Sequence, residues 1–251
     1  MIDVALTRGQ IRDCEVAVVI DVLRATSTAV SALAAGYTRV VFAESLEDAR
    51  GLRGSGRVLA GERDCIPPPG FDQGNSPREV TRPRGRELVL STTNGAPAVI
   101  AATRAAGMVL LASMLNLQAT IDALASAEGT IQVICAGAGG LASLEDVYVA
   151  GRLVAMLEGE RTDAARIAET VAAAYRTPAA ALRTGAGGVA LRAAGLGEDI
   201  AHCARESRLP LVAVAVADGT LAVAEREAQP GGAARPCIAS QTREGVHGMS
   251  M

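Results

Sequence analysis

The stretch that decides the fold is Val16-Ala17-Val18-Val19-Ile20-Asp21-Val22-Leu23-Arg24-Ala25-Thr26-Ser27, in which an apolar run stops at a polar cluster. After the cluster, the sequence continues in a helical pattern of apolar residues. This order is typical of a buried strand that leads through a loop into a helix. The stretch therefore predicts one strand–loop–helix unit of an α/β protein.

The same pattern occurs twice more along the chain. Leu88-Val89-Leu90 precedes Thr92-Thr93-Asn94-Gly95, and Ile131-Gln132-Val133-Ile134-Cys135 precedes a Gly-rich stretch that leads to Ser143-Leu144-Glu145-Asp146. In open α/β sheets, ligands bind at the carboxyl ends of the strands. The polar clusters are therefore expected to meet in one small-molecule site.

Short apolar runs alternate with helical patterns along most of the chain. This alternation predicts a mostly parallel sheet covered by helices on both faces. The predicted strands are Asp3–Leu6, Val16–Asp21, Arg39–Ala43, Val58–Ala60, Leu88–Ser91, Met108–Ala112, Ile131–Cys135 and Leu211–Ala217. The predicted helices are Ser27–Ala35, Leu46–Arg53, Ala96–Ala106, Leu117–Ala127, Ser143–Leu157, Asp163–Ala174, Pro178–Arg183, Gly188–Ala193 and Gly197–Glu206.

No linker is long or polar enough to divide the first part of the chain, so residues 1–217 are predicted to form a single α/β domain. The run Ile66-Pro67-Pro68-Pro69-Gly70 is interpreted as a loop because apolar structure resumes on both sides. Residues 218–251 include a Gly- and Pro-rich stretch and are predicted to be a largely disordered C-terminal extension.

The composition excludes several classes of function. A net charge of −3, with three Tyr, two Phe and no Trp, predicts neither a phosphate-backbone surface nor base-stacking platforms, so no nucleic-acid partner is expected. The chain contains no lysine, which excludes a Schiff base and a Walker A phosphate loop. The 24 basic residues are all arginines, which are suited to a bidentate grip on carboxylate or phosphate.

The five cysteines show no C-x-x-C spacing, which predicts buried thiols in a reducing cytoplasm. The sequence has no signal-peptide pattern at its start and no apolar run of membrane-spanning length. A cytoplasmic protein with no membrane partner is expected.

The first polar cluster has two interpretations. Asp21 could hold a metal or act as a base, Arg24 could bind an anion, and Thr26 and Ser27 could offer hydroxyl groups at a helix N-terminus. Alternatively, Thr26 or Ser27 could simply cap the helix, with Arg24 in solvent.

The other clusters leave similar alternatives open. Thr93 or Asn94 could cap a helix or contact an anion. Ser143-Leu144-Glu145-Asp146 fits a capping box, in which Ser143 and Asp146 are the capping residues. Glu145 has no role in capping and could be a metal ligand. The polar loop from Gly61 to Pro77 could be functional or an Ω-loop held by local turns.

The two histidines, His202 and His247, argue against a His-rich zinc site and a Ser-His-Asp triad, because one is alone in a helical pattern and the other lies near the end of the chain. The groups that remain as candidates for the chemistry of the site are carboxylates, arginines and backbone amides. These groups suit Mg²⁺-assisted chemistry on a small phosphorylated anion.

Several motifs, in this order, closely resemble those of the 2-phosphosulfolactate phosphatase family over about residues 15–217. They are Asp21-Val22-Leu23-Arg24-Ala25-Thr26-Ser27-Thr28, Gly61-Glu62-Arg63, Gly70-Phe71-Asp72-x-Gly74-Asn75-Ser76-Pro77, Thr92-Thr93-Asn94-Gly95, and Cys135-Ala136-Gly137 with Ser143-x-Glu145-Asp146. The stretch Gly195-x-Gly197-x-Asp199-Ile200-x-x-Cys203 extends the resemblance.

The resemblance implies a three-layer α/β/α fold with a mostly parallel (mixed) sheet and a Mg²⁺-dependent phosphatase activity. The family's reaction converts 2-phospho-3-sulfolactate to 3-sulfolactate and phosphate, a step toward coenzyme M. The expected catalytic residues are Asp21, Glu62, Asp72 and Glu145, and the expected Mg²⁺ ligands are Asp21, Glu145 and Asp146. The expected substrate-binding residues are Arg24, Thr26, Ser27, Arg63, Asn75, Ser76, Thr93, Asn94, Gly95, Gly137 and Ser143.

Two alternatives to this function remain at the level of sequence. The substrate could be another small phosphorylated carboxylic acid, or the chain could be a non-catalytic anion-binding protein of the same fold. The Ala-rich helices Ser143–Leu157 and Asp163–Ala174 could pack internally or across the interface of a homodimer.

Overall fold

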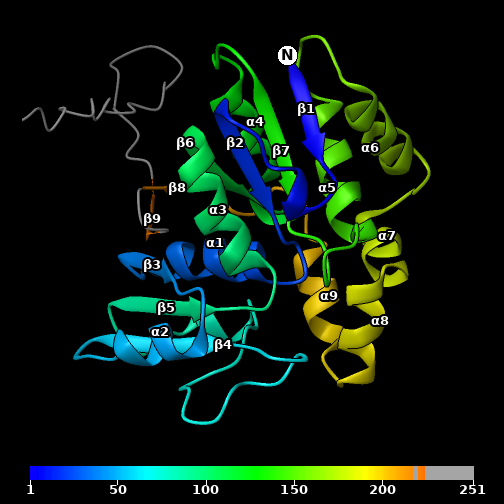
Figure 1. Ribbon diagram of the computed structural model, residues 1–251. Helices are drawn as coiled ribbons and strands as arrows, with labels where there is room; N and C mark the ends of the chain where they lie inside the picture. Colours follow the sequence, from blue (N-terminus) through cyan, green and yellow to red (C-terminus); the bar gives the residue numbers. More distant parts are fainter. Residues whose placement is uncertain (217–219, 224–251) are drawn as a thin grey trace, which may run out of the picture.

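The computed structural model describes residues 1–216 and 220–223. Within these residues, the strands form one nine-stranded sheet with helices on both faces (Figure 1). Most neighbouring strands are parallel. The predicted α/β fold with a mostly parallel, mixed central sheet is therefore confirmed.

The helices and strands alternate along the chain as the apolar pattern predicts. The strands are β1 (Ile2–Ala5), β2 (Cys14–Ile20), β3 (Arg39–Phe42), β4 (Arg57–Gly61), β5 (Glu87–Ser91), β6 (Ala106–Ala112), β7 (Ile131–Cys135), β8 (Ala213–Ala215) and β9 (Thr220–Val223). The helices are α1 (Ala25–Ala35), α2 (Leu46–Gly51), α3 (Gly95–Ala105), α4 (Leu117–Leu124), α5 (Leu144–Val154), α6 (Asp163–Ala173), α7 (Pro178–Thr184), α8 (Ala186–Ala193) and α9 (Gly197–Cys203).

The sheet consists of two parallel blocks joined by an antiparallel pair of strands. Its order is β1-β7-β2-β6-β8-β9-β3-β5-β4, and β8 and β9 pair antiparallel with each other and with the blocks on either side. In the first block, Ile20 pairs with both Ala112 and Cys135, so β2, β6 and β7 end at the same level. In the second block, Gly61 pairs with Ser91. The loops that follow these strands therefore leave from aligned carboxyl ends.

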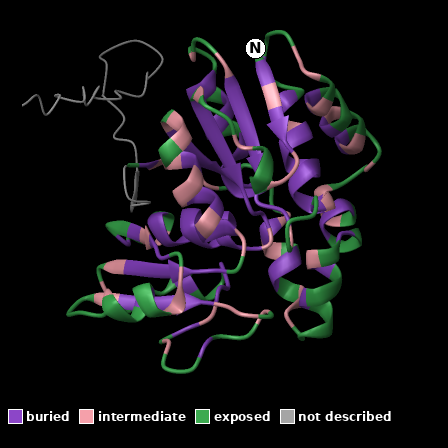
Figure 2. Ribbon diagram, viewed as in Figure 1, coloured by how far each residue is buried: buried purple, intermediate pink, exposed green. Residues whose placement is uncertain are grey.

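Two apolar cores separate the sheet from its helices. On one face, β1, β2 and β7 pack against α4 and α5, and α6 covers α5. On the other face, α1 and α3 lie between the two blocks and contact strands of both (Figure 1). Val16–Ile20 and all of β7 are buried, so the central strands are shielded on both faces (Figure 2). This burial explains why these strands appear in the sequence as uninterrupted apolar runs.

The predicted elements before residue 217 correspond to β1–β8 and α1–α9, with ends that differ by a few residues. Strand β9 is not among the predicted strands because its four residues are followed by a polar, Gly- and Pro-rich sequence. It lies within residues 218–251, which were predicted to be a disordered extension, and it pairs with β3 and β8. The remainder of that extension, residues 224–251, lies outside the described residues.

Helices α5 and α6 pack against each other within the chain, which settles where part of their apolar surface is buried. Gly151 of α5 approaches the backbone of α6 so closely that a Cβ atom there would collide with the carbonyl group of Ala168. Ala165, Ala168 and Ala172 on the facing side of α6 are buried. Small residues on both helices thus allow the two backbones to come into close contact. Among the described residues, no helix is both long and apolar enough to cross a membrane.

We expect Gly151→Ala to lower the free energy of unfolding by roughly 1–3 kcal/mol, because the new methyl group must push α5 and α6 apart. The measurement is equilibrium unfolding in urea. Gly51→Ala is the matched control, because Gly51 is also helical but no atom lies within 4 Å of a Cβ atom built there. If the two variants unfold at the same urea concentration, the result would contradict a close contact between α5 and α6 at Gly151.

Candidate active site

The turn between β2 and α1 presents Asp21 at the carboxyl end of the sheet. The Ala25 N–H donates to Asp21 Oδ1 at 3.1 Å, and the Thr26 hydroxyl donates to the Asp21 carbonyl oxygen at 2.9 Å. The Ser27 hydroxyl donates to the Val22 carbonyl oxygen at 2.8 Å. Arg24, rather than Thr26 or Ser27, occupies the N-cap position of α1. The capping interpretation of these two hydroxyl residues is therefore wrong, and both instead fix the turn that holds Asp21.

Asp146, in the first turn of α5, joins this turn to the loop after β7. The Val22 N–H donates to Asp146 Oδ1 at 2.9 Å, and the Gly137 N–H donates to Asp146 Oδ2 at 3.2 Å. Ser143 occupies the N-cap position of α5, but its side chain makes no capping hydrogen bond. The capping-box interpretation is therefore wrong, because the Asp146 carboxylate is directed across the sheet edge instead.

Glu145 lies beside Asp146 and is 3% exposed. Its Oε1 atom accepts a hydrogen bond of 2.9 Å from the Gly187 N–H, at the start of α8. Its Oε2 atom is buried and has no hydrogen-bond partner. A Cβ atom at Gly185 or Gly187 would collide with this carboxylate, so α8 approaches it closely because both positions lack a side chain. A buried acceptor without a partner is rare in proteins and marks a place where a ligand or ion can bind.

Burial makes it unfavourable for Asp21 and Asp146 to carry a charge without compensation. Burial and the nearby charges of Glu62 and Glu145 together raise the pKa of Asp21 to about 7, against the opposing effects of the Ala25 N–H hydrogen bond and Arg24. Burial also raises the pKa of Asp146 well above its ordinary value, with Asp21 and Glu145 acting in the same direction. At neutral pH the cluster therefore favours a bound proton or a bound cation.

Glu62 links the loop after β4 to the loop after β5. Its Oε1 atom accepts a hydrogen bond of 2.8 Å from the Thr93 N–H, and its Oε2 atom accepts one of 3.3 Å from the Cys65 N–H. Arg63 is held in the same place, because its guanidinium donates to the Glu62 carbonyl oxygen at 2.6 Å and to the Ser91 hydroxyl at 3.3 Å. The loop from Gly61 to Pro77 is thus fixed to the second block of the sheet.

The end of the same loop reaches α1 and α9. The Thr28 hydroxyl donates to the Asn75 carbonyl oxygen at 3.3 Å, while Asn75 Oδ1 is buried without a partner. The Ser76 hydroxyl donates to Asp199 Oδ1 at 2.8 Å. Arg24 forms an ion pair of 2.7 Å with Asp199 Oδ2. These contacts place the predicted anion-binding residues of two distant segments side by side.

The Thr92–Gly95 cluster faces the Gly-rich loop after β7. The Gly139 N–H donates to Asn94 Oδ1 at 3.3 Å, and the Ala96 N–H donates to the Thr92 hydroxyl at 2.9 Å. Asn94 is the N-cap residue of α3 by position, but its side chain makes no capping hydrogen bond. A Cβ atom at Gly95 would collide with Asp21 Oδ2, so the start of α3 touches the carboxylate only because residue 95 is glycine.

The structure thus brings most of the predicted site residues to one region. Asp72 differs from them, because it is exposed, accepts a hydrogen bond of 2.8 Å from the Leu59 N–H and pairs with Arg53 at 3.4 Å. These contacts hold the loop against β4 and give no support to the predicted catalytic role of Asp72. Asp199 and the Gly185–Gly187 segment belong to the site region but were not among the predicted site residues. Neither follows a strand, and only the motif around Asp199 gave a signal in the sequence.

The donor atoms of the site are compatible with Mg²⁺. Among residues 1–216 and 220–223, no group of three or more His, Cys, Asp or Glu side chains is arranged as a metal-holding cluster. Mg²⁺, however, commonly binds one or two carboxylates and completes its shell with water and substrate phosphate. Glu145 Oε2 has no partner, and in the described part of the chain Asp21 Oδ2 accepts no hydrogen bond either, whereas both Asp146 oxygens accept backbone N–H groups. Asp21 and Glu145 therefore fit direct ligation better than Asp146.

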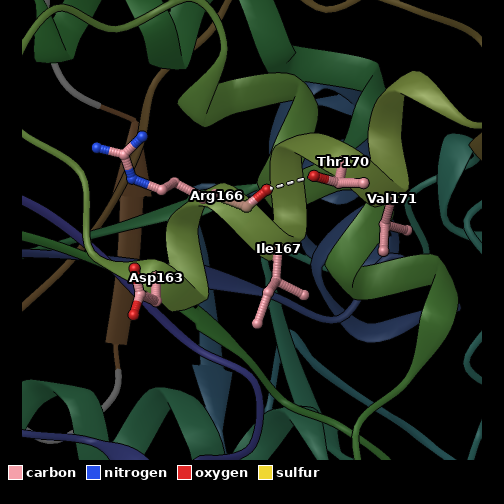
Figure 3. Close-up of a pocket in the computed structure, with 5 residues that line it drawn as sticks. All are labelled: Asp163, Arg166, Ile167, Thr170 and Val171. Carbon is pink, nitrogen blue, oxygen red and sulfur yellow. Dashed lines mark hydrogen bonds between the residues drawn. The ribbon is translucent and has the colours of Figure 1, made fainter.

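A surface hollow on α6 is distinct from this region. Its lining residues, shown in Figure 3, are Asp163, Arg166, Ile167, Thr170 and Val171. The Thr170 hydroxyl donates to the Arg166 carbonyl oxygen of the preceding turn at 2.8 Å. None of the predicted site residues lines this hollow, and all five lining residues belong to one helix.

We expect the stability of the protein without divalent cations to fall as the pH rises from about 5 to about 8.5, because the folded state holds a proton on Asp21 that the unfolded state has released. A pKa raised in the folded state stabilises the fold below the unfolded pKa, and this stabilisation is lost as the pH passes about 7. Relative to Asp21→Asn, the loss is roughly 3 kcal/mol. Urea unfolding of both proteins across this pH range is the measurement, and parallel stability curves would contradict the raised pKa.

Comparison with known proteins shows the family of the chain. The family model described as 2-phosphosulpholactate phosphatase matches residues 3–218. Proteins named probable 2-phosphosulfolactate phosphatase are similar to the chain: one from Thermus thermophilus is 42% identical over 207 residues (80% of this chain, 87% of the relative). One from Thermotoga petrophila is 43% identical over 172 residues (67% and 74%), and one from Deinococcus radiodurans is 40% identical over 207 residues (79% and 86%). The chain belongs to the 2-phosphosulfolactate phosphatase family.

Proposed function

We propose that this protein hydrolyses the phosphate ester of 2-phospho-3-sulfolactate, yielding 3-sulfolactate and phosphate. In this reaction the oxygen atom of a water molecule bonds to phosphorus, the ester P–O bond breaks, and the released alkoxide takes a proton. The observation that carries the proposal is the buried cluster of Asp21, Glu145 and Asp146 beside the Arg24 guanidinium, in a chain that belongs to a phosphatase family. The names of the relatives support the choice of substrate.

The residues of the site suit each part of this substrate. Its phosphate, carboxylate and sulfonate groups are all anionic, so it needs several donors and at least one compensating cation. Arg24 supplies a buried positive charge, while the N–H groups of Gly137 and Gly139 hold the Asp146 carboxylate and the Asn94 side chain in place. The Gly-rich backbone allows a ligand to approach closely.

We further propose that Mg²⁺ is the cofactor, held by Asp21 and Glu145 and supported by Asp146. When bound, Mg²⁺ neutralises negative charge that develops on the phosphoryl oxygens. Asp21 Oδ2 and Glu145 Oε2, which accept no hydrogen bond in the described part of the chain, are the atoms that would ligate the ion. Asp146 holds the Val22 and Gly137 backbones in place around the Asp21 carboxylate. On this proposal, the reaction is a step of the coenzyme M biosynthesis type.

The test is phosphate release from 2-phospho-3-sulfolactate with and without Mg²⁺, beside phospholactate, phosphoglycerate and phosphoglycolate. We expect Mg²⁺-dependent release that is fastest on the sulfonate substrate. Fastest release on another compound would retain the phosphatase chemistry and overturn the substrate. Tight binding of these anions without any release would instead favour a non-catalytic anion-binding protein.

We expect Asp21→Asn and Glu145→Gln each to lower kcat by about 10²-fold or more, because each substitution removes a carboxylate that the proposed reaction uses. Glu169→Gln, which removes the α6 partner of the half-buried ion pair with Arg161, is the control and is expected to leave kcat unchanged. Steady-state kinetics at saturating substrate and Mg²⁺ give the comparison. Full turnover in both site variants would show that the assignment of the carboxylates is wrong.

A further inference from the structure

We propose that Asp199 is a positioning residue that holds the Arg24 guanidinium in the orientation needed to bind an anionic group of the substrate. The inference deepens the proposed function and rests on it, because it assigns a role to a carboxylate that the reaction itself does not need. Its basis is the buried contact between α9 and two loops from distant parts of the chain.

The Arg24–Asp199 pair is almost completely removed from solvent. The two side chains are 3% and 1% exposed, and Arg24 Nη1 lies 2.7 Å from Asp199 Oδ2. Within the described residues, the Arg24 side chain donates only one other hydrogen bond. This bond is long, at 3.4 Å, and runs from Nη2 to the Cys65 carbonyl oxygen. A guanidinium has five N–H donors. Asp199 therefore fixes one edge of the group and leaves several donors for a ligand.

Asp199 is itself held rigidly. Its Oδ1 atom accepts a hydrogen bond of 2.8 Å from the Ser76 hydroxyl, and Ser76 Oγ accepts one of 3.3 Å from the Arg78 N–H. The Asp199 N–H donates to the Leu196 carbonyl oxygen at 3.0 Å, in the first turn of α9. The carboxylate thus uses one oxygen atom for the loop and the other for Arg24.

A competing attraction explains why Arg24 needs such a partner. Arg24 lies close enough to Asp21 to lower the pKa of that carboxyl group, and Glu62 lies close enough to raise it. A buried guanidinium without a partner carries a large desolvation cost, so it would turn toward the nearest free carboxylate. Pairing with Asp21 would occupy both the anion-binding cation and a proposed catalytic group. Asp199 keeps the two apart.

The first test is Asp199→Asn, which retains the shape of the side chain and removes its charge. We expect KM for the phosphorylated substrate to rise about tenfold or more while kcat changes less than about threefold, because Arg24 contributes binding in both ground and transition states. Ser76→Ala is expected to shift KM in the same direction by a smaller factor. Glu169→Gln, in the half-buried pair with Arg161, is the control for loss of an Arg–carboxylate pair elsewhere. A KM equal to that of the control would overturn the proposal.

The second test separates positioning from a merely structural role. Arg24→Ala leaves a space between Asp199 and the ligand, and guanidinium ion added well below denaturing concentrations is expected to restore part of the lost substrate affinity. The double variant with Arg24→Ala and Asp199→Asn is expected to show no such rescue, because the ion then has no carboxylate to hold it. Equal rescue of both variants would show that Asp199 does not orient the cation.

A binding measurement distinguishes failure of this inference from failure of the proposed function. Calorimetric titration of inorganic phosphate into the wild-type protein and into Asp199→Asn requires no turnover. A dissociation constant about tenfold higher in the variant supports the positioning role even if no substrate is hydrolysed. Equal dissociation constants in a folded variant overturn the positioning role even if the protein proves to be a phosphatase.

Discussion

The burial of three carboxyl groups at the ends of β2 and β7 is the constraint on which the rest of the site depends. Asp21, Glu145 and Asp146 are each less than one-tenth exposed, and none has a basic side chain as a direct ion-pair partner in the described residues. Backbone N–H groups supply most of their hydrogen bonds. Such an arrangement is costly in an empty site, and it becomes favourable when a proton or cation binds.

The fold supports this cluster through close backbone contacts. Gly95, Gly185 and Gly187 each approach a carboxylate to a distance that excludes a Cβ atom. The three glycines lie in two segments: Gly95 at the start of α3, and Gly185 and Gly187 at the start of α8. The parallel register of β2 with β7 aligns the carboxyl ends of the two strands whose following segments carry the three carboxyl groups. A regular, rigid sheet therefore provides the alignment, and glycines provide the space.

The two parallel blocks contribute different parts of the site. The first block carries the carboxylates, whereas the loops after β4 and β5 provide Glu62, Arg63 and the segment that ends at Ser76. Helices α1 and α3 lie between the blocks, which explains why the residues at their starts contact both. The antiparallel strands β8 and β9 lie between the two blocks and join them into one sheet.

Much of this could be predicted from sequence because the strands before the site are continuous apolar runs that end at polar residues. The apolar run Val16–Ile20, followed by a helical pattern, predicts both the strand β2 and the position of Asp21 at its carboxyl end. The capping interpretations failed because a hydroxyl or carboxylate near a helix start has several possible partners, and only the folded chain decides between them. Asp199 could not be placed because its partner Arg24 is 175 residues away. Asp72 was grouped with the site because its neighbours in sequence belong there, although its own side chain faces Arg53.

The central claim is that the carboxyl cluster exchanges a proton for a cation. Calorimetric titration of Mg²⁺ into the protein, repeated in two buffers with different ionisation enthalpies, measures the protons released per bound ion. At a pH about one unit below the Asp21 pKa of about 7, we predict release that approaches one proton per Mg²⁺, from Asp21. Mg²⁺ binding without proton release, or no binding at all, would contradict the account.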